Sequence, residues 1–364
     1  WYSLIGLSAI ALYAGALRTA GIGWARVRWS LVGAYIVAYV WWFFANGIII
    51  DRVSVLWSFA IFLTVASVGR PPREWMRSAG DLGVFVAMWL AYDESRGIAD
   101  GLGMPIQVES VRNLDRLLFF GADPVVELQA AFHRTEIAER VVNGEIVLRT
   151  VTDVQWYDVV GSFVYYSHFI IPPVVIGALW LINRHQWVRY MRRFATLLFG
   201  ACVMFVLLPT APPWMAAGGT NRVGLDLAAL PSLSRHTGVG WRYVGLGSFV
   251  EAWDTGRDWA NQVAAMPSLH SAFALFVVVF FWPWVHNPWA RAATLAYPLA
   301  MAVALAYFAE HYIVDAVAGW LLVGTVFWLW NRIERSGPID DESLDYEKAV
   351  ETRNSLISAE AARA

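Results

Sequence analysis

Long runs of apolar residues separated by short polar stretches dominate this chain. A helix that crosses the hydrocarbon core of a membrane, about 30 Å thick, needs roughly 20 mostly apolar residues. Nine segments approach that length, at about 1–17, 30–50, 53–69, 80–92, 158–182, 194–210, 269–285, 292–309 and 312–331, the fourth being the shortest. The pattern therefore predicts an all-α, polytopic membrane protein.

Arginines in alternate connections predict the orientation of these helices, because short loops rich in positive charge stay on the cytoplasmic side. Such loops follow the first, third and fifth segments, and Arg291, Arg332 and Arg335 continue the series. Nine crossings then place the connections near Asp51, 93–157, 211–268 and 310–311 outside the cytoplasm. The chain begins at Trp1 rather than Met, so we expect residues upstream, and the first segment, which lacks signal-peptide features, is an anchor or a trimmed span.

The polar parts of the chain divide it into four regions. Residues 1–92 hold N-terminal helices, and 93–157 form a connection with an amphipathic stretch, LDRLLFFGADPVVELQAAFH, that suits an interfacial helix or a soluble cap. Residues 158–335 form the core, whose long loop 211–268 is typical of a lid or binding loop. The acidic tail 336–364 is expected to be disordered and cytoplasmic.

Composition narrows the class of protein further. The chain is 58% hydrophobic and 15% charged, against about 25% charged residues in soluble domains. A net charge of -2 gives no reason to expect nucleic-acid binding. The single cysteine, Cys202, excludes an intramolecular disulfide and suits a buried thiol. Lys348 is the only lysine, and this arginine-based, alanine-rich usage favours a bacterial plasma membrane with a periplasmic outer side.

Two histidine motifs fall at helix ends on the same predicted side of the membrane, where ionisable groups are costly unless they meet water, a partner or a substrate. In MPSLHSAF, Pro267 suits a first helical turn, and free amides from Ser268 to His270 would face an anion. In EHYIVD, His311 and Asp315 are four residues apart and share one helix face. A carboxylate that holds one ring nitrogen leaves the other free as a nucleophile. A histidine at a helix end is often only a hydrogen-bonding residue, yet two such motifs together favour a phosphoryl-transfer site.

These motifs resemble a known family. PSLH at 267–270 and HYIVD at 311–315 are similar to the second and third signature motifs of the type 2 phosphatidic acid phosphatase superfamily, with a comparable spacing of about forty residues. LPTAPPW at 208–214, and less specifically SHF at 167–169 and LDRLLF, resemble the inositol phosphorylceramide synthase-like branch. The resemblance covers roughly 110–331.

The resemblance implies roles for the motif residues. His311 would attack phosphorus and form a phosphohistidine, Asp315 would orient it, and His270 would protonate the leaving oxygen. Ser268 and neighbouring amides would hold phosphate oxygens. The fold would be a six-helix core with extra N-terminal helices. No metal or other cofactor is implied, and the sequence has no tight carboxylate cluster for magnesium.

The sequence departs from the family in its phosphate-binding arginines. A Ser-Arg pair before the nucleophilic histidine is replaced by Ala304 and Leu305, and the only Arg-Pro, at Arg70, lies on the predicted cytoplasmic side. Phosphoryl transfer needs positive charge around the phosphate oxygens. The remaining donors, of which we prefer the first and third, are Arg222, Arg235, Arg242 and Arg257, each with acidic residues nearby as alternative partners. His168 is either a pocket residue or a helix-to-helix hydrogen-bonding residue.

Three functions compete on this sequence. The first is a lipid phosphatase or phosphotransferase acting on a phospholipid or polyprenyl phosphate at the outer face; LPTAPPW favours transfer, and the superfamily at large favours hydrolysis. The second is an intramembrane metalloprotease using Glu310 with the two histidines and Asp315, although no HExxH motif is present. The third is a non-catalytic lipid-binding or transport protein, favoured by the missing arginines but lacking internal duplication. Head group, acceptor and oligomeric state are not specified by the sequence.

Overall fold

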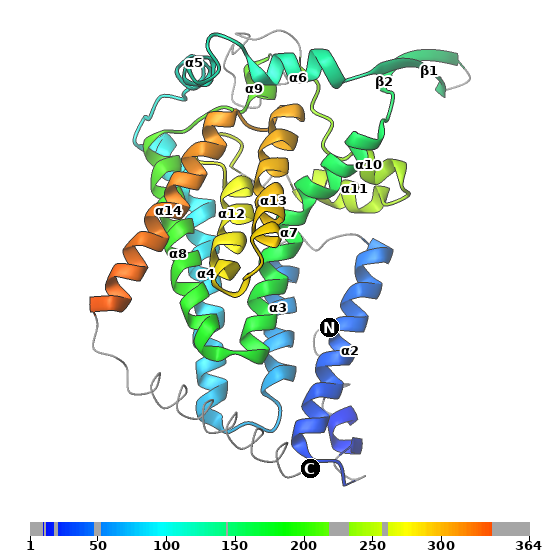
Figure 1. Cartoon of the computed structure of the whole chain (residues 1–364). Coiled ribbons are helices and arrows are strands. Elements are labelled where there is room, and N and C mark those ends of the chain that lie inside the picture. Colours follow the sequence, from blue (N-terminus) through cyan, green and yellow to red (C-terminus); the bar gives the residue numbers. More distant parts are fainter. Residues whose placement is uncertain are drawn as a thin grey trace. The chain divides into compact units, whose positions relative to one another are not determined.

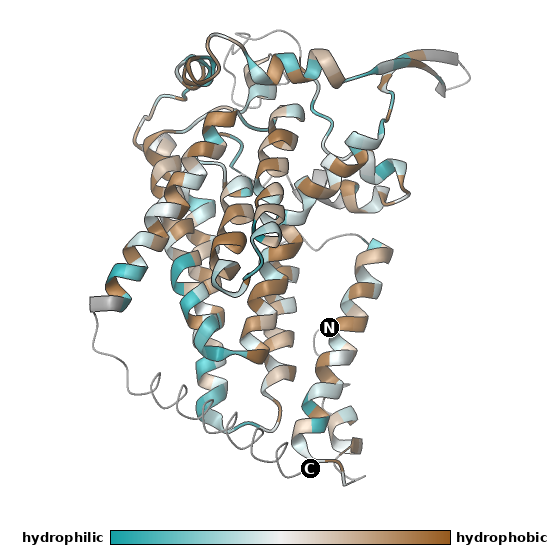
Figure 2. Cartoon of the chain, in the orientation of Figure 1, coloured by the Kyte–Doolittle hydropathy of each residue, from teal (hydrophilic) through white to brown (hydrophobic). Residues whose placement is uncertain are grey.

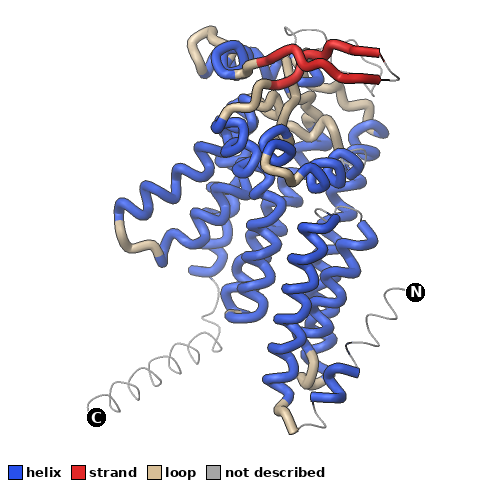
Figure 3. The backbone as a smooth tube through the Cα atoms, turned by 90° about the vertical axis from the view of Figure 1, so that its right-hand side faces the viewer, coloured by secondary structure: helices blue, strands red, loops and turns tan. Residues whose placement is uncertain are grey.

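The computed structural model describes residues 10, 12–17, 21–46, 52–142, 145–217, 233–256 and 261–336. The chain divides into two compact units, residues 1–323 and 324–364, and helix α14 (Ile313–Ser336) runs from the first into the second. Helices account for nearly all regular structure in the described part, and one hairpin supplies the strands (Figure 3).

Five helices are long and apolar enough to span a membrane. They are α2 (Trp24–Asn46), α7 (Trp156–Ile182), α8 (Arg184–Leu207), α13 (Pro288–Tyr307) and the stretch Ile313–Glu334 of α14. Two shorter apolar helices are α3 (Arg52–Ser67) and α12 (Leu269–Phe281). Hydrophobic residues dominate the middle of the long helices, whereas α8 begins with hydrophilic turns (Figure 2). The predicted fold class, an all-α polytopic membrane protein, is confirmed.

Other segments differ in detail from the expected spans. The fourth, 80–92, lies inside the 30-residue helix α4 (Pro72–Gly101), whose charged residues keep it out of the group of five. Most of the first segment and the tail beyond Ser336 lie outside the described residues.

The connection between α4 and α7 contains more structure than the sequence led us to expect. The amphipathic stretch forms α5 (Glu109–Leu118) and α6 (Pro124–Phe132), followed by an antiparallel hairpin of β1 (Thr135–Val142) and β2 (Glu145–Thr152). The hairpin was not predicted, although Asn-Gly between two runs of β-branched residues is a strong local signal for a two-residue turn.

The segment between α8 and α12 is not a structureless loop. Its described parts contain three short helices, α9 (Pro213–Ala216), α10 (Val239–Tyr243) and α11 (Gly247–Gly256). A 3₁₀ turn, η2 (Trp282–Trp284), then connects α12 to α13. Residues 218–232, which include Arg222, and residues 257–260 lie outside the described part.

Helix α7 is the centre of the packing in the first unit. It contacts α8, α10, α12 and α13, and α12 lies beside α13 (Figure 1). Tyr165 and Tyr166 of α7 form a buried aromatic cluster with Trp241 of α10 and Phe249 of α11. Helix α14 approaches the start of α12 at Gly319, where an added Cβ would lie 2.6 Å from the carbonyl oxygen of Ser268. This close approach brings the two histidine motifs to one place.

Candidate active site

The turn that carries His311 begins where α13 ends. The amide of Glu310 donates to the carbonyl of Leu305 at 2.9 Å, and that of Ala309 donates to Ala306 at 3.0 Å, which is a Schellman arrangement. Ala309 takes the left-handed position of this motif with a φ of 58°, where glycine is the usual residue. The turn stops α13 sharply, so His311 follows within four residues of the last helical residue, Tyr307.

Asp315 holds the ring of His311. One of its oxygens, Oδ2, lies 3.4 Å from His311 Nδ1 and also accepts the amide of Tyr312 at 3.0 Å. The side chain of Asp315 is fully buried. Because a carboxylate only accepts, Nδ1 of His311 carries the proton, and Nε2 is left with its lone pair.

The free nitrogen of His311 faces His270 from α12. His311 Nε2 lies 3.3 Å from His270 Nδ1, and the ring centroids are 5.2 Å apart. With the lone pair on His311 Nε2, His270 Nδ1 is the nitrogen that donates. The structure thus brings together His270, His311 and Asp315.

Two residues of α7 fix the ring of His270. Tyr165 stacks on it at 5.1 Å between centroids, and the ring of His168 contacts it at 3.8 Å. His168 Nδ1 donates to the carbonyl of Tyr165 at 2.8 Å, which is a bond within its own helix. His168 is therefore buried and packs against His270, and its recorded hydrogen bond stays within α7.

Ser268 makes its recorded hydrogen bonds with backbone groups. It is the N-cap of α12, and its hydroxyl accepts the amide of Ser271. Its own amide donates to the backbone carbonyl of Asp315 at 2.9 Å, and the residue is fully buried. The expectation that this amide is free for an anion is wrong, because Ser268 joins α12 to α14. Pro267 likewise precedes the N-cap instead of occupying the first turn.

Among the loop arginines that the structure describes, Arg235 is bonded to Glu310, the residue directly before His311. Its guanidinium donates to both carboxylate oxygens of Glu310, at 2.5 and 2.9 Å, and lies 4.3 Å from the ring centroid of Trp214. The amide of Trp214 in turn donates to Ala309 at 3.0 Å. Arg242, by contrast, is exposed on α10.

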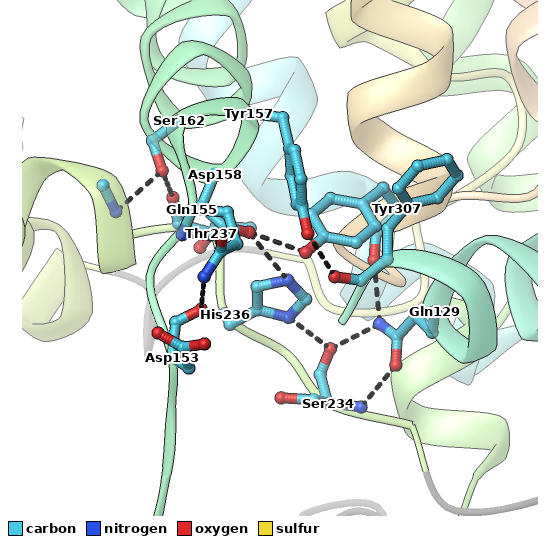
Figure 4. A network of polar contacts seen from close by, with 12 residues as sticks. Gln129, Asp153, Gln155, Tyr157, Asp158, Ser162, Ser234, His236, Thr237 and Tyr307 are labelled. Carbon is cyan, nitrogen blue, oxygen red and sulfur yellow. Dashed lines mark hydrogen bonds and ion pairs between the residues drawn. The ribbon is translucent and has the colours of Figure 1, made fainter. Parts of the chain in front are cut away.

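A polar network, consisting of Gln129, Asp158, Ser234, His236 and Tyr307, holds the segment that carries Arg235 (Figure 4). Gln129 donates to the carbonyls of Ser234 and Tyr307 at 2.7 and 2.8 Å and accepts the amide of Ser234. Tyr307 donates to Asp158 at 2.6 Å, and His236 lies 3.8 Å from the same carboxylate oxygen. Residues of α6, α7 and α13 all take part in this network, and the neighbours of Arg235 in the chain, Ser234 and His236, are held by it.

This network predicts a pH-dependent stability. Burial lowers the pKa of His236 to about 4, and neighbouring His133 adds to the effect. Since an unfolded histidine has a pKa of about 6.5, the folded protein binds this proton less tightly. The contribution of neutral His236 to the free energy of unfolding is fully present above pH 6.5. It falls by up to about 3 kcal/mol as the pH drops towards 4. We expect His236→Gln to weaken the fall in unfolding temperature between neutral and acidic pH in detergent. The exposed His286→Gln should leave it unchanged, and equal pH dependence in both variants would contradict this origin.

The metalloprotease hypothesis receives no support from the donor geometry. Glu310, its proposed base or ligand, is engaged with Arg235. Within the described ranges, no three His, Cys, Asp or Glu side chains are grouped closely enough to hold a metal ion.

The sequence does not single out two residues that the structure places near the histidine motifs. Arg235 is one of four similar loop arginines, and nothing in the sequence distinguishes it from the other three. Asp115 is one polar position of the amphipathic stretch, and its place beside Leu114 in LDRLLF is only a weak signal of a buried carboxylate.

Comparison with known proteins supplies the family. No curated protein and no solved structure shows a significant match. A sequence profile of the PAP2 superfamily matches residues 131–329, a range that includes α7, α8, α12, α13 and both histidine motifs. Because this match spans more than half of the 364 residues, the chain belongs to the PAP2 superfamily.

Proposed function

We propose that this membrane protein transfers the phosphoryl group of a lipid-linked phosphate through a phosphohistidine formed on His311. The observation that carries the proposal is the alignment of one buried imidazole between a carboxylate at 3.4 Å and a second imidazole at 3.3 Å. Membership of the PAP2 superfamily suggests phosphatase-type chemistry on lipid phosphates.

In the first step, Nε2 of His311 attacks phosphorus, and the bond between phosphorus and the lipid oxygen breaks. The leaving oxygen takes the proton from His270, and the positive charge on His311 is stabilised by Asp315. In the second step, a hydroxyl group or water attacks the phosphohistidine and gives its proton to His270. The nitrogen–phosphorus bond breaks, and both rings return to their starting state. The phosphoryl group replaces the hydrogen bond between the rings when it enters.

Arg235 is the best-placed side chain to neutralise the phosphate. Its fork is engaged with Glu310, so a dianionic phosphate has to compete with that carboxylate for the same N–H groups. Trp214, the last residue of LPTAPPW, stacks on this guanidinium, which supports a role for that segment in the phosphate pocket and the kinship with the inositol phosphorylceramide synthase-like branch. Arg222 and Arg242 stay as further proposed donors, and Ser268 stays as a proposed contact for a phosphate oxygen. The site faces outward, on the periplasmic side of a bacterial plasma membrane, in this proposal.

Purified protein in detergent tests the proposal with three substrates: phosphatidic acid, a polyprenyl diphosphate and phosphatidylinositol. We expect turnover of at least one, and added inositol or diacylglycerol should divert the phosphoryl group from water if the enzyme is a transferase. A rate indistinguishable from that of a mock purification with all three would contradict catalysis. Saturable binding of the same lipids without turnover would instead favour a non-catalytic lipid-binding protein, an alternative consistent with the pairing of Arg235 and Glu310.

A further inference from the structure

The helix that carries Asp315 has a tyrosine at the position before its first residue. Tyr312 precedes the first helical residue of α14, Ile313. Helices usually start after Ser, Thr, Asp or Asn, whose short side chains accept the amides of the first turn. A phenol is too long and rigid to reach back to these amides. The first amides of α14 therefore need an acceptor from another part of the chain.

Asp115 of α5 supplies that acceptor. Its Oδ1 accepts the amide of Val314 at 2.8 Å across 199 residues of sequence. Only 1% of Asp115 is exposed. A carboxylate at this place also meets the positive end of the helix dipole.

The surrounding packing holds Asp115 in place. Val111, one turn earlier on α5, is buried in a cluster that includes Tyr312 and Val125 of α6. Arg112 pairs with Asp123 at 2.8 Å, which ties α5 to the start of α6. The packing of Val111 and the ion pair of Arg112 thus hold α5, and with it the carboxylate of Asp115, against the first turn of α14.

The carboxylates of Asp115 and Asp315 accept different groups at this turn. Asp315 Oδ2 is used by His311 Nδ1 and by the amide of Tyr312. Without Asp115, the amide of Val314 loses its acceptor, and the first turn, which contains Asp315, is free to fray. An imidazole whose orienting carboxylate moves by about 1 Å loses most of its alignment with phosphorus.

We infer that Asp115 is a positioning residue that caps α14 from another helix and thereby fixes the orientation of His311 and Asp315. The inference rests on the proposed function, because it assigns these two residues to the reaction. Asp115 itself does not touch the substrate.

Two substitutions separate capping from mere packing. Asp115→Asn keeps an acceptor oxygen and should retain kcat within about threefold, since Asn and Asp cap equally well. Asp115→Ala should lower kcat by about 10- to 100-fold with little change in KM. Glu109→Ala, an exposed acidic position on the same helix, should behave as wild type. Burial raises the pKa of Asp115 to about 6, so assays at about pH 8 keep it charged.

A readout independent of activity is hydrogen exchange of the peptide that contains residues 311–316. Asp115→Ala should accelerate its exchange, and Asp115→Asn should not. If the alanine variant fails to fold, Asp115→Leu fills the space without an acceptor and should show the same losses. Unchanged exchange in a folded Ala or Leu variant, or an Asn variant as impaired as Ala, would overturn the inference. Failure of the wild type to turn over any lipid would instead count against the proposed function alone.

Discussion

Replacing His311 with asparagine is expected to lower lipid-phosphate turnover by about 10⁴-fold or more, because a carboxamide cannot form the nitrogen–phosphorus bond. Asparagine keeps a hydrogen-bonding group near Asp315, which limits damage to the fold. The measurement is the steady-state rate together with trapping of labelled phosphate on the protein after alkaline denaturation, since phosphohistidine survives alkali and is labile to acid. Wild-type protein should show labelled His311, and the variant should show none.

The matched control for this experiment is His185→Asn, because His185 is exposed near the start of α8, far along the chain from both motifs. It should retain both turnover and labelling. Labelling of the His311 variant at the wild-type level would show that another group attacks phosphorus, and the mechanism would have to be abandoned.

Replacing His270 with asparagine should have an effect that depends on the leaving group. With a lipid alcohol as leaving group, we expect turnover to fall by about 10²- to 10⁴-fold, because His270 Nδ1 is the proposed proton donor. With p-nitrophenyl phosphate, whose leaving group needs no proton, the first step should stay within about tenfold of wild type. The second step still lacks its base, so a burst of p-nitrophenol should precede slow turnover, and phosphohistidine should accumulate.

Stopped-flow absorbance measures the burst, and alkaline trapping measures the accumulated intermediate. His286→Asn, at an exposed position beyond the other end of α12, serves as the control and should show wild-type kinetics. Equal losses for the lipid and for p-nitrophenyl phosphate would mean that His270 acts by binding or structure instead of proton transfer.

The short spacing of the site residues could be predicted from the sequence. His311 and Asp315 are four residues apart, which keeps ring and carboxylate close together, but the expected shared helix face is wrong, because His311 lies two residues before the first helical residue of α14, Ile313. The apolar lengths of α7, α8, α13 and α14 likewise follow from the thickness of a membrane. The hairpin of β1 and β2 also had a local signal in the sequence, Asn143-Gly144, which the pattern of apolar segments does not reveal.

Contacts between residues far apart in the chain could not be predicted, because no periodicity of the sequence encodes them. Four arginines in the loop before α12 look alike, and only the bond to Glu310 and the ring of Trp214 distinguish Arg235. Asp115 looks like one polar position of an amphipathic helix, and only its bond to Val314 shows that it caps another helix. The free amide expected at Ser268 is taken by Asp315, a partner 47 positions away in the numbering.

The sequence by itself therefore determined that the chain is a polytopic helical membrane protein, and it pointed to His270, His311 and Asp315 as chemistry-bearing residues. Apolar length and short spacing are properties of single segments, so they can be read before the chain is folded. The tertiary structure alone decided that the two imidazoles meet, which loop arginine is bonded to Glu310 and what caps α14. Each of those contacts joins residues from separate helices, and their distance depends on packing such as the approach of Gly319 to Ser268, which no single segment specifies.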